Sequence, residues 1–173
     1  GVNRFPAGFY GYYSTRTKDL KLNRYWSTPS EIEPVSSNFK DHVLGFKERF
    51  LEACKLRTRS DISVGVTLSG GLDSSSIFCT LDYLSKNNLL NNNIDWRNSF
   101  VARYPNSFLD EKEYVDSVLG EVDSSHHELI INPDDALIDL NKNTYLYEEL
   151  FFTNPFPMFK IYELISQKNI LQS

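Results

Sequence analysis

The chain has 173 residues, a formal net charge of −5, and ordinary apolar and charged fractions of 40% and 24%. This size allows one α/β core and little more. No apolar run is long enough to span a membrane, so we expect no membrane partner. No signal peptide is visible, although the sequence begins at Gly1 and a targeting segment could have been lost, and we expect a cytoplasmic protein.

The charge is distributed unevenly along the chain. Residues 1–60 carry eleven Lys/Arg and six Asp/Glu side chains, a balance of +5, whereas residues 61–173 carry seven and seventeen, a balance of −10. The basic part is interleaved with aromatic residues, a pattern that can indicate nucleic-acid binding. We favour the simpler interpretation, in which these charges cover solvated faces of strands and helices, and expect no nucleic-acid partner.

The first sixty residues predict a hairpin, a connector and a helix. Residues 8–14 and 20–26 alternate in polarity around a polar link, which is typical of a β-hairpin. A Pro/Ser/Glu-rich connector follows over residues 27–37, and its composition indicates a domain boundary. From residue 38 to 57 apolar side chains recur every three or four positions, which predicts a helix with one apolar face. That face comprises Phe39, Val43, Phe46, Phe50 and Cys54.

The rest of the chain alternates between strand and helix patterns. Strands are predicted over residues 62–68, 99–104 and 127–131. Four helices are expected. The first covers residues 74–86, the second follows a capping box formed by Asp110 and Glu113, the third begins near Pro133, and the fourth follows Pro157. The side chains expected to face inward are Ile77, Leu81, Leu84, Tyr114, Val118 and Leu119. This order predicts an α/β fold with a parallel sheet covered on both faces, in which ligands bind beyond the carboxyl ends of the strands.

The cysteines and histidines do not form a metal-binding pattern. Cys54 and Cys79 lack the C-x-x-C spacing and lie in apolar helical patterns, so we expect two buried free thiols in a reducing compartment. The adjacent His126 and His127 would face opposite ways in a strand, and three histidines are too few and poorly spaced for a zinc centre.

The segment from Val64 to Ser76 is the most informative about chemistry. A β-branched apolar run ends in Ser-Gly-Gly, followed by an aspartate and three serines that can open a helix. Such a junction binds anions, because glycines let the backbone approach a phosphate and the first helical N–H groups point towards it. It is not a Walker A loop, since no lysine follows Gly71, and its glycine spacing does not match the dinucleotide fingerprint. The expected phosphate contacts are Ser69, Gly70, Gly71, Ser74 and Ser75.

Asp73 needs a separate explanation, because its negative charge would repel a phosphate. We favour a role in holding Mg²⁺, which takes one or two carboxylates together with phosphate oxygens. The alternative is that Asp73 pairs with the dipole at the start of its helix.

The sequence Ser-Gly-Gly-Leu-Asp-Ser-Ser at residues 69–75 resembles the pyrophosphate loop of the N-type ATP pyrophosphatases. Those enzymes cleave ATP between the α and β phosphates and leave an acyl-adenylate. Beyond this loop, the chain is similar to the glutamine-dependent asparagine synthetases over most of its length. The matching segments are residues 5–10 and 24–26, Asp110-Glu111 with Tyr114, residues 126–128, and residues 145–149. The resemblance implies a Rossmann-like sheet of the adenine nucleotide alpha hydrolase type.

The resemblance also implies a domain organisation. Residues 1–26 correspond to the C-terminal end of a glutaminase domain, residues 27–37 to a linker, and residues 38–173 to a partial synthetase domain. The family's N-terminal cysteine nucleophile, its second Gly-rich acidic loop and a later lysine have no counterpart here. We therefore expect a fragment, or a truncated relative, that is inactive alone.

Family chemistry implies the roles of individual residues. With ATP and Mg²⁺ as cofactors, the aspartate side-chain carboxylate attacks the α phosphorus, and glutamine-derived ammonia then displaces AMP to give asparagine. The family places the adenine against the backbone at Leu68 and around Val101 and Ala102, and the alternative is that these residues are ordinary core positions at the ends of strands.

Glu148 is the candidate catalytic residue, either as a base that deprotonates the incoming ammonium or as a residue that orients the substrate. The alternative, that Glu148 is an exposed helical acid without a catalytic role, stays open. Asp110 is expected to be a helix cap and not a catalytic residue. Arg103, at the end of the second predicted strand, could meet phosphate or substrate, but no spacing rule supports this and we assign it no role.

Other functions stay open beside an asparagine-forming ligase. A family variant could make another amide, such as a β-lactam or a cyclised peptide. A tRNA-thiolation enzyme shares the loop, but the acidic second part of this chain disfavours an RNA substrate. A non-catalytic nucleotide-binding domain is the alternative outside enzymology, and a homodimer is left open.

Overall fold

A computed structural model describes residues 3–32, 36–90, 95–148, 156–168 and 171–172. The chain divides into two compact units, Gly1–Gly45 and Phe46–Ser173, and each is described by itself. The boundaries expected at residues 26 and 37 stay predictions. No helix within these described ranges is both long enough and apolar enough to cross a bilayer.

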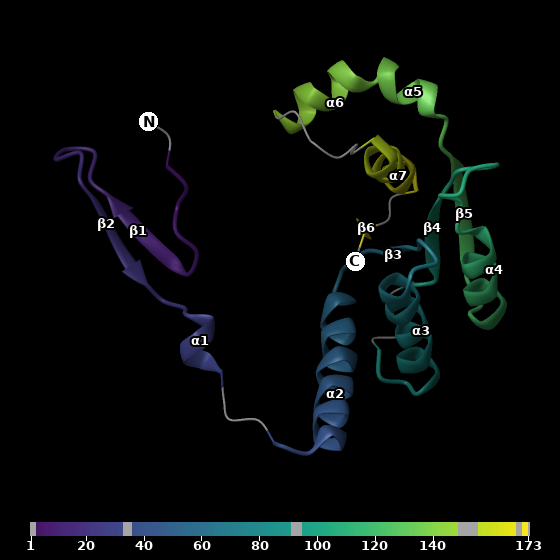
Figure 1. Cartoon of the computed structure of the whole chain (residues 1–173), viewed down its shortest axis with the longest axis horizontal. Coiled ribbons are helices and arrows are strands. Elements are labelled where there is room, and N and C mark those ends of the chain that lie inside the picture. The colour runs from purple at the N-terminus through teal and green to yellow at the C-terminus, as the bar shows by residue number, and fades with distance from the viewer. Residues whose placement is uncertain (1–2, 33–35, 91–94, 149–155, 169–170, 173) are drawn as a thin grey trace. The chain divides into compact units, whose positions relative to one another are not determined.

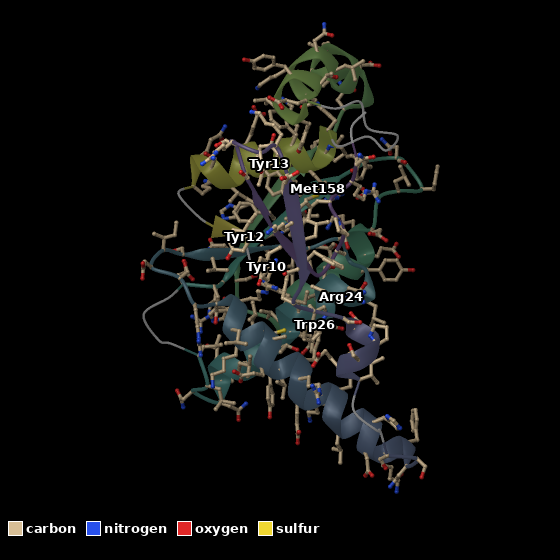
Figure 2. The ribbon with its side chains drawn as sticks, turned by 90° about the vertical axis from the view of Figure 1, so that its left-hand side faces the viewer. Tyr10, Tyr12, Tyr13, Arg24, Trp26 and Met158 are labelled. Atoms are coloured by element: carbon tan, nitrogen blue, oxygen red, sulfur yellow. The ribbon has the colours of Figure 1, made fainter. Side chains whose placement is uncertain are left out.

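The first unit contains the predicted hairpin. Strands β1 (Phe9–Tyr13) and β2 (Leu20–Arg24) pair antiparallel, and the short helix α1 (Thr28–Glu31) follows in the connector. Gly8 has φ +72°, and a Cβ atom there would lie 2.3 Å from the carbonyl oxygen of Trp26, so only glycine fits where the two strands leave the hairpin. The labelled aromatic side chains of this unit are exposed (Figure 2): Tyr10, Tyr12, Tyr13 and Trp26.

The second unit contains the predicted parallel sheet. Its strand order is β5 (Ser125–Ile130), β4 (Asn98–Arg103), β3 (Val64–Thr67) and β6 (Leu171–Gln172), and every neighbouring pair is parallel. Helices connect the strands (Figure 1): α3 (Leu72–Lys86), α4 (Lys112–Glu121), α5 (Pro133–Ile138), α6 (Leu140–Tyr147) and α7 (Phe156–Gln167). The predicted α/β class is confirmed.

Both faces of this sheet are buried. On one face Leu68 and Val101 pack with Phe78 from α3 and Val115 from α4, and each of these four side chains is at most 2% exposed. The C-terminal part of α2 (Phe39–Arg57) joins the same cluster through Cys54. On the other face Phe100 packs against α7. Successive strand side chains alternate between faces, so the central strand β3, which is covered on both sides, is buried at consecutive positions, whereas the edge strand β5 is only partly buried.

Two sequence predictions about side chains are wrong, those of a buried Tyr114 and a buried Cys79. Tyr114 is 66% exposed, because the side of α4 that faces the core carries Val115, Val118, Leu119 and the C-cap residue Val122 instead. Phe46 is 71% exposed, so the apolar face of α2 is covered only towards its C-terminal end. Cys79 is exposed and Cys54 alone is buried, because Phe78 occupies the inward position of α3 instead.

The predicted capping box is also wrong. The N-cap of α4 is Glu111, and no side chain caps this helix. The carboxylate of Asp110 binds Arg103 and is therefore directed away from the helix.

Candidate nucleotide-binding site

The loop between β3 and α3 depends on a glycine at its turn. Leu68 continues the strand pairing, since its N–H donates to the carbonyl of Phe100 at 2.8 Å. The chain then turns at Gly70, whose φ of +79° is rarely adopted by other residues. A Cβ atom on Gly70 would lie 2.9 Å from the Tyr114 Cβ and 3.1 Å from the Glu111 carbonyl oxygen. Gly70 is therefore needed both for the turn and for the close approach to α4.

The serine hydroxyls of this loop bind one another. The Oγ atoms of Ser69 and Ser74 lie 3.0 Å apart, and the Ser69 N–H donates to Ser74 Oγ at 3.2 Å. The Gly71 N–H donates to Ser69 Oγ at 3.3 Å, and the Ser74 hydroxyl donates to the Gly71 carbonyl at 3.3 Å. These bonds tie the loop to the first turn of α3. The Ser75 hydroxyl is buried and has no hydrogen-bond partner among the described residues.

The start of α3 is open to an anion. Its N-cap is Gly71, so no side-chain oxygen satisfies the first helical N–H groups. Asp73 lies in the first turn, is exposed, and makes no hydrogen bond or ion pair with another described residue. A free carboxylate beside the loop that we predict to bind phosphate would suit Mg²⁺, which takes carboxylates together with phosphate oxygens. Within the described ranges, no group of three acidic, histidine or cysteine side chains gathers as a complete metal site.

A cavity of about 480 Å³ lies at the carboxyl ends of β3 and β4, where ligands of parallel sheets bind. Four predicted site residues line it: Leu68, Ser69, Ser74 and Val101. Gly70, Gly71, Asp73 and Ser75 belong to the adjoining loop and helix turn without lining the cavity. Glu148 does not line it either, and it caps α6 in a left-handed conformation with φ 54°. The structure therefore brings the loop and the two strand ends together and leaves Glu148 outside this cavity.

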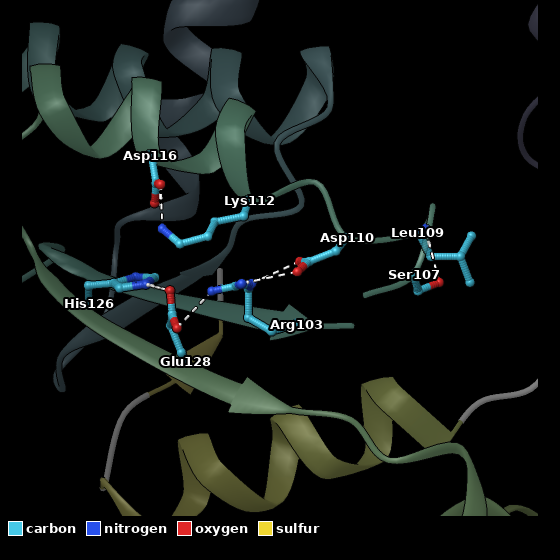
Figure 3. A network of polar contacts seen from close by, with 8 residues as sticks. All are labelled: Arg103, Ser107, Leu109, Asp110, Lys112, Asp116, His126 and Glu128. Atoms are coloured by element: carbon cyan, nitrogen blue, oxygen red, sulfur yellow. Dashed lines mark hydrogen bonds and ion pairs between the residues drawn. The ribbon is translucent and has the colours of Figure 1, made fainter. Parts of the chain in front are cut away.

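An arginine-centred network reaches the cavity through Arg103 and Asp110, and sequence reasoning missed it (Figure 3). Arg103 binds Asp110 through two parallel bonds, Nε to Oδ1 at 2.8 Å and Nη2 to Oδ2 at 3.0 Å. Its Nη1 lies 2.9 Å from Glu128 Oε2, and Glu128 Oε1 lies 3.0 Å from His126 Nε2. The chain of contacts ends at Ser99, whose Oγ lies 3.2 Å from His126 Nδ1. We call these five residues the Arg103 network.

Arg103, Asp110 and Glu128 stabilise one another in their charged forms. Hydrogen bonding to Arg103 lowers the pKa of Asp110, and bonds from His126 and then Arg103 lower the pKa of Glu128. The same carboxylates raise the pKa of Arg103, chiefly through its bonds to Asp110. The other cation that lines the described cavity wall, Lys112, pairs with Asp116. Both cations are thus engaged by carboxylates.

The sequence contained one signal for this network. Arg103 is a charged residue at the carboxyl end of an otherwise buried strand, a position that requires a partner or a ligand. Its partners were not identifiable, because Asp110 follows after a loop and Glu128 belongs to the next strand in a register that sequence does not show.

Comparison with known proteins identifies the family. The asparagine synthase family model matches residues 45–171. A putative glutamine-hydrolysing asparagine synthetase 2 of Methanocaldococcus jannaschii is 28% identical over 148 residues, which cover 85% of this chain and 27% of that protein. The amidase chry2 of Gibberella zeae is 48% identical over 88 residues, which cover 50% of this chain and 13% of that protein.

The chain thus spans about a quarter of the first relative's length and about an eighth of the second's. Among solved structures, an NAD⁺ synthetase from Burkholderia pseudomallei aligns with a TM-score of 0.44 and 13% identity, covering 84% of this chain and 65% of that one. A likeness of this size bears on neither function nor substrate. The family model spans most of the chain, and the matched range includes the Ser69–Ser75 loop and the cavity wall. The chain belongs to the asparagine synthase family.

Proposed function

We propose that this chain contributes the nucleotide-binding part of an ATP-dependent amide ligase that forms asparagine. The observation on which the proposal rests is the Ser69–Ser75 loop, which joins β3 to α3 beside a cavity of about 480 Å³ in a chain of this family. In the proposed reaction a side-chain oxygen of aspartate attacks the α phosphorus of ATP and pyrophosphate leaves. Ammonia derived from glutamine then attacks the acyl carbon, and AMP leaves.

The buried strand ends are proposed to bind the adenine. Leu68 and Val101 are each 2% exposed and line the cavity, so they offer a rigid apolar wall to a planar base. The phosphates are proposed to lie against the backbone of Gly70 and Gly71 and the first N–H groups of α3. Since both lining cations pair with carboxylates, the phosphate charge would be balanced by helix N–H groups and by Mg²⁺ at Asp73.

Glu148 stays our candidate for the residue that handles the attacking ammonium. Its left-handed backbone conformation is uncommon for a glutamate, and such strained residues are concentrated at functional sites. It is exposed, so its carboxylate is available to a substrate. We also propose that the protein is cytoplasmic and forms a homodimer. The proposed reaction depends on neither property.

A second candidate is a family member that makes a different amide. The observation that favours it is the 48% identity with the amidase chry2, which exceeds the 28% identity with the putative asparagine synthetase 2 but extends over fewer residues. Both candidates use the same nucleotide chemistry, so they differ in the acid that is activated and in the amine that accepts it.

The experiment is pyrophosphate release by the full-length protein with ATP, Mg²⁺ and one carboxylic acid at a time. We expect aspartate to stimulate release, and asparagine to form when glutamine or ammonium is added. The Asp73→Ala variant should lose at least about a hundredfold in rate, because the leaving pyrophosphate would lack its counterion. Lys86→Met, which removes an exposed ion pair with Asp82 at the far end of α3, is the matched control. Stimulation by another acid and not by aspartate would favour the second candidate.

A further inference from the structure

We propose that Arg103 is a positioning residue for the phosphate-binding loop. Through Asp110 it fixes the first turn of α4, and that turn is the surface against which Gly70 is packed. The consequence for ATP rests on the proposed function, whereas the mechanical coupling between Arg103 and the loop does not depend on it.

The ion pair is built to hold a geometry. Arg103 is the last residue of β4, and Asp110 directly precedes the N-cap of α4, so the bidentate pair ties the end of a core strand to the start of a helix. The two side chains are only 11% and 13% exposed. After the side-chain bond from Arg103, the backbone of Tyr104 also contributes to the lowered pKa of Asp110.

The other side of the guanidinium is fixed by strand β5. Glu128 binds Nη1 and is itself oriented by His126, which Ser99 on β4 holds from its other ring nitrogen. The guanidinium of Arg103 is therefore held in place and cannot turn to follow a displacement of Asp110. A planar guanidinium held by carboxylates on two sides transmits position better than a flexible ammonium would.

The first turn of α4 contacts the phosphate-binding loop directly. A Cβ atom on Gly70 would lie 3.1 Å from the carbonyl oxygen of Glu111, 3.3 Å from its Cβ, and 2.9 Å from the Cβ of Tyr114. The same Glu111 carbonyl accepts the N–H groups of Tyr114 and Val115, each at 3.1 Å. A displacement of Asp110 would move this turn and open space beside Gly70.

Arg103 is not proposed as a direct phosphate ligand. Its single positive charge faces two carboxylates, Asp110 and Glu128, so the three groups together carry a charge of −1. A phosphate approaching them would have to displace a bidentate partner and face the second acid. Direct phosphate binding is therefore the competing outcome of the test.

The test measures amide hydrogen exchange in the full-length protein without nucleotide, for wild type, Arg103→Met, Arg103→Lys and the control Lys86→Met. We expect Arg103→Met to exchange about tenfold faster or more at residues 104–115 and also at residues 69–72, with peptides of β4 unchanged. Arg103→Lys should fall between, because lysine keeps the charge but cannot bind both partners in parallel. Lys86→Met should match wild type in both segments, since its ion pair lies at the other end of α3.

Kinetics of the same variants separate positioning from general destabilisation. Arg103→Met should raise the KM for ATP by about ten- to a hundredfold, since small misplacements of a binding loop have effects of that size. Faster exchange at residues 104–111 with an unchanged loop at residues 69–72 would overturn the proposal. A raised KM with unchanged exchange would overturn it in favour of direct phosphate binding. If wild type neither binds nor cleaves ATP while the exchange coupling is present, the proposed function fails and the positioning role stands. Should Arg103→Met not fold, Arg103→Lys and Asp110→Asn give the same readouts.

Discussion

Replacing Gly70 with alanine tests the architecture of the Ser69–Ser75 loop most sharply. An L-residue in the left-handed region costs about 1–2 kcal/mol, and Gly70 has φ +79°. The added Cβ would also lie 3.1 Å from a backbone oxygen and 2.9 Å from a Cβ atom, neither of which can rotate away. Overpacking of this kind costs about 1–3 kcal/mol. We therefore expect Gly70→Ala to lower the free energy of unfolding by about 2–5 kcal/mol, a large fraction of the roughly 5–15 kcal/mol of a typical domain.

Urea unfolding measures this loss, and two other glycines, Gly71 and Gly120, serve as controls. A midpoint lower by roughly 1–2 M is expected for Gly70→Ala. Gly71→Ala should cost less than about 1 kcal/mol, because its φ is −68° and the nearest atom is a rotatable Ser69 hydroxyl at 3.3 Å. Gly120→Ala, in α4 with no atom within 4 Å of a Cβ, should stabilise by about 0.5–1 kcal/mol. Equal midpoints for Gly70→Ala and Gly71→Ala would refute the reasoning.

Two further predictions concern titratable groups. Burial raises the pKa of the Cys54 thiol, and partial desolvation together with the charges of Asp82 and Glu121 raises the pKa of the Cys79 thiol. Because the surface of Cys79 is exposed and Cys54 is buried, a thiol reagent at pH 8 should label Cys79 slowly in the native protein and Cys54 only after denaturation, as mass spectrometry of the labelled peptides would show. Equal labelling of both native thiols would contradict this. The pKa values of Asp110 and Glu128 are lower in the folded protein than in the unfolded chain, where they are about 3.9 and 4.3. The two carboxylates therefore contribute fully to folding stability above their unfolded pKa values, and this contribution is lost as the pH falls through their folded pKa values. The difference in free energy of unfolding between wild type and Arg103→Met, measured by urea titration, should therefore become smaller from pH 6 to pH 3. A difference that does not change with pH would argue against a contribution from the ion pair.

Local pattern was sufficient to predict most of the fold. The alternation of β-branched runs with helical periods predicted the parallel sheet, and the Ser-Gly-Gly turn predicted the position of the loop. These features succeed because they depend on a few adjacent residues whose conformations are restricted. The structure adds to the loop its internal serine bonds, which involve Ser69 and Ser74 five positions apart.

The features that sequence missed depend on contacts between distant segments. Glu128 reaches Arg103 only because β4 and β5 pair with Val101 opposite Glu128. Asp110 had the spacing of a helix cap, but a charged partner in the adjoining strand outcompetes the helix N–H groups for its carboxylate. On α3 the predicted Leu81 and Leu84 are buried and Ile77 packs against the core. On α4 Val118 and Leu119 also pack against the core, but Val115 takes the buried position expected for Tyr114, because the exact phase of a helix is set by tertiary packing.

The most direct test of the proposed function is the position at which ATP is cleaved. ATP labelled at the α phosphate, incubated with the full-length protein, Mg²⁺ and aspartate, should yield labelled AMP together with pyrophosphate, and Asp73→Ala should suppress both. Labelled ADP with inorganic phosphate would contradict cleavage between the α and β phosphates. Unchanged AMP formation by Asp73→Ala would contradict the role proposed for that carboxylate.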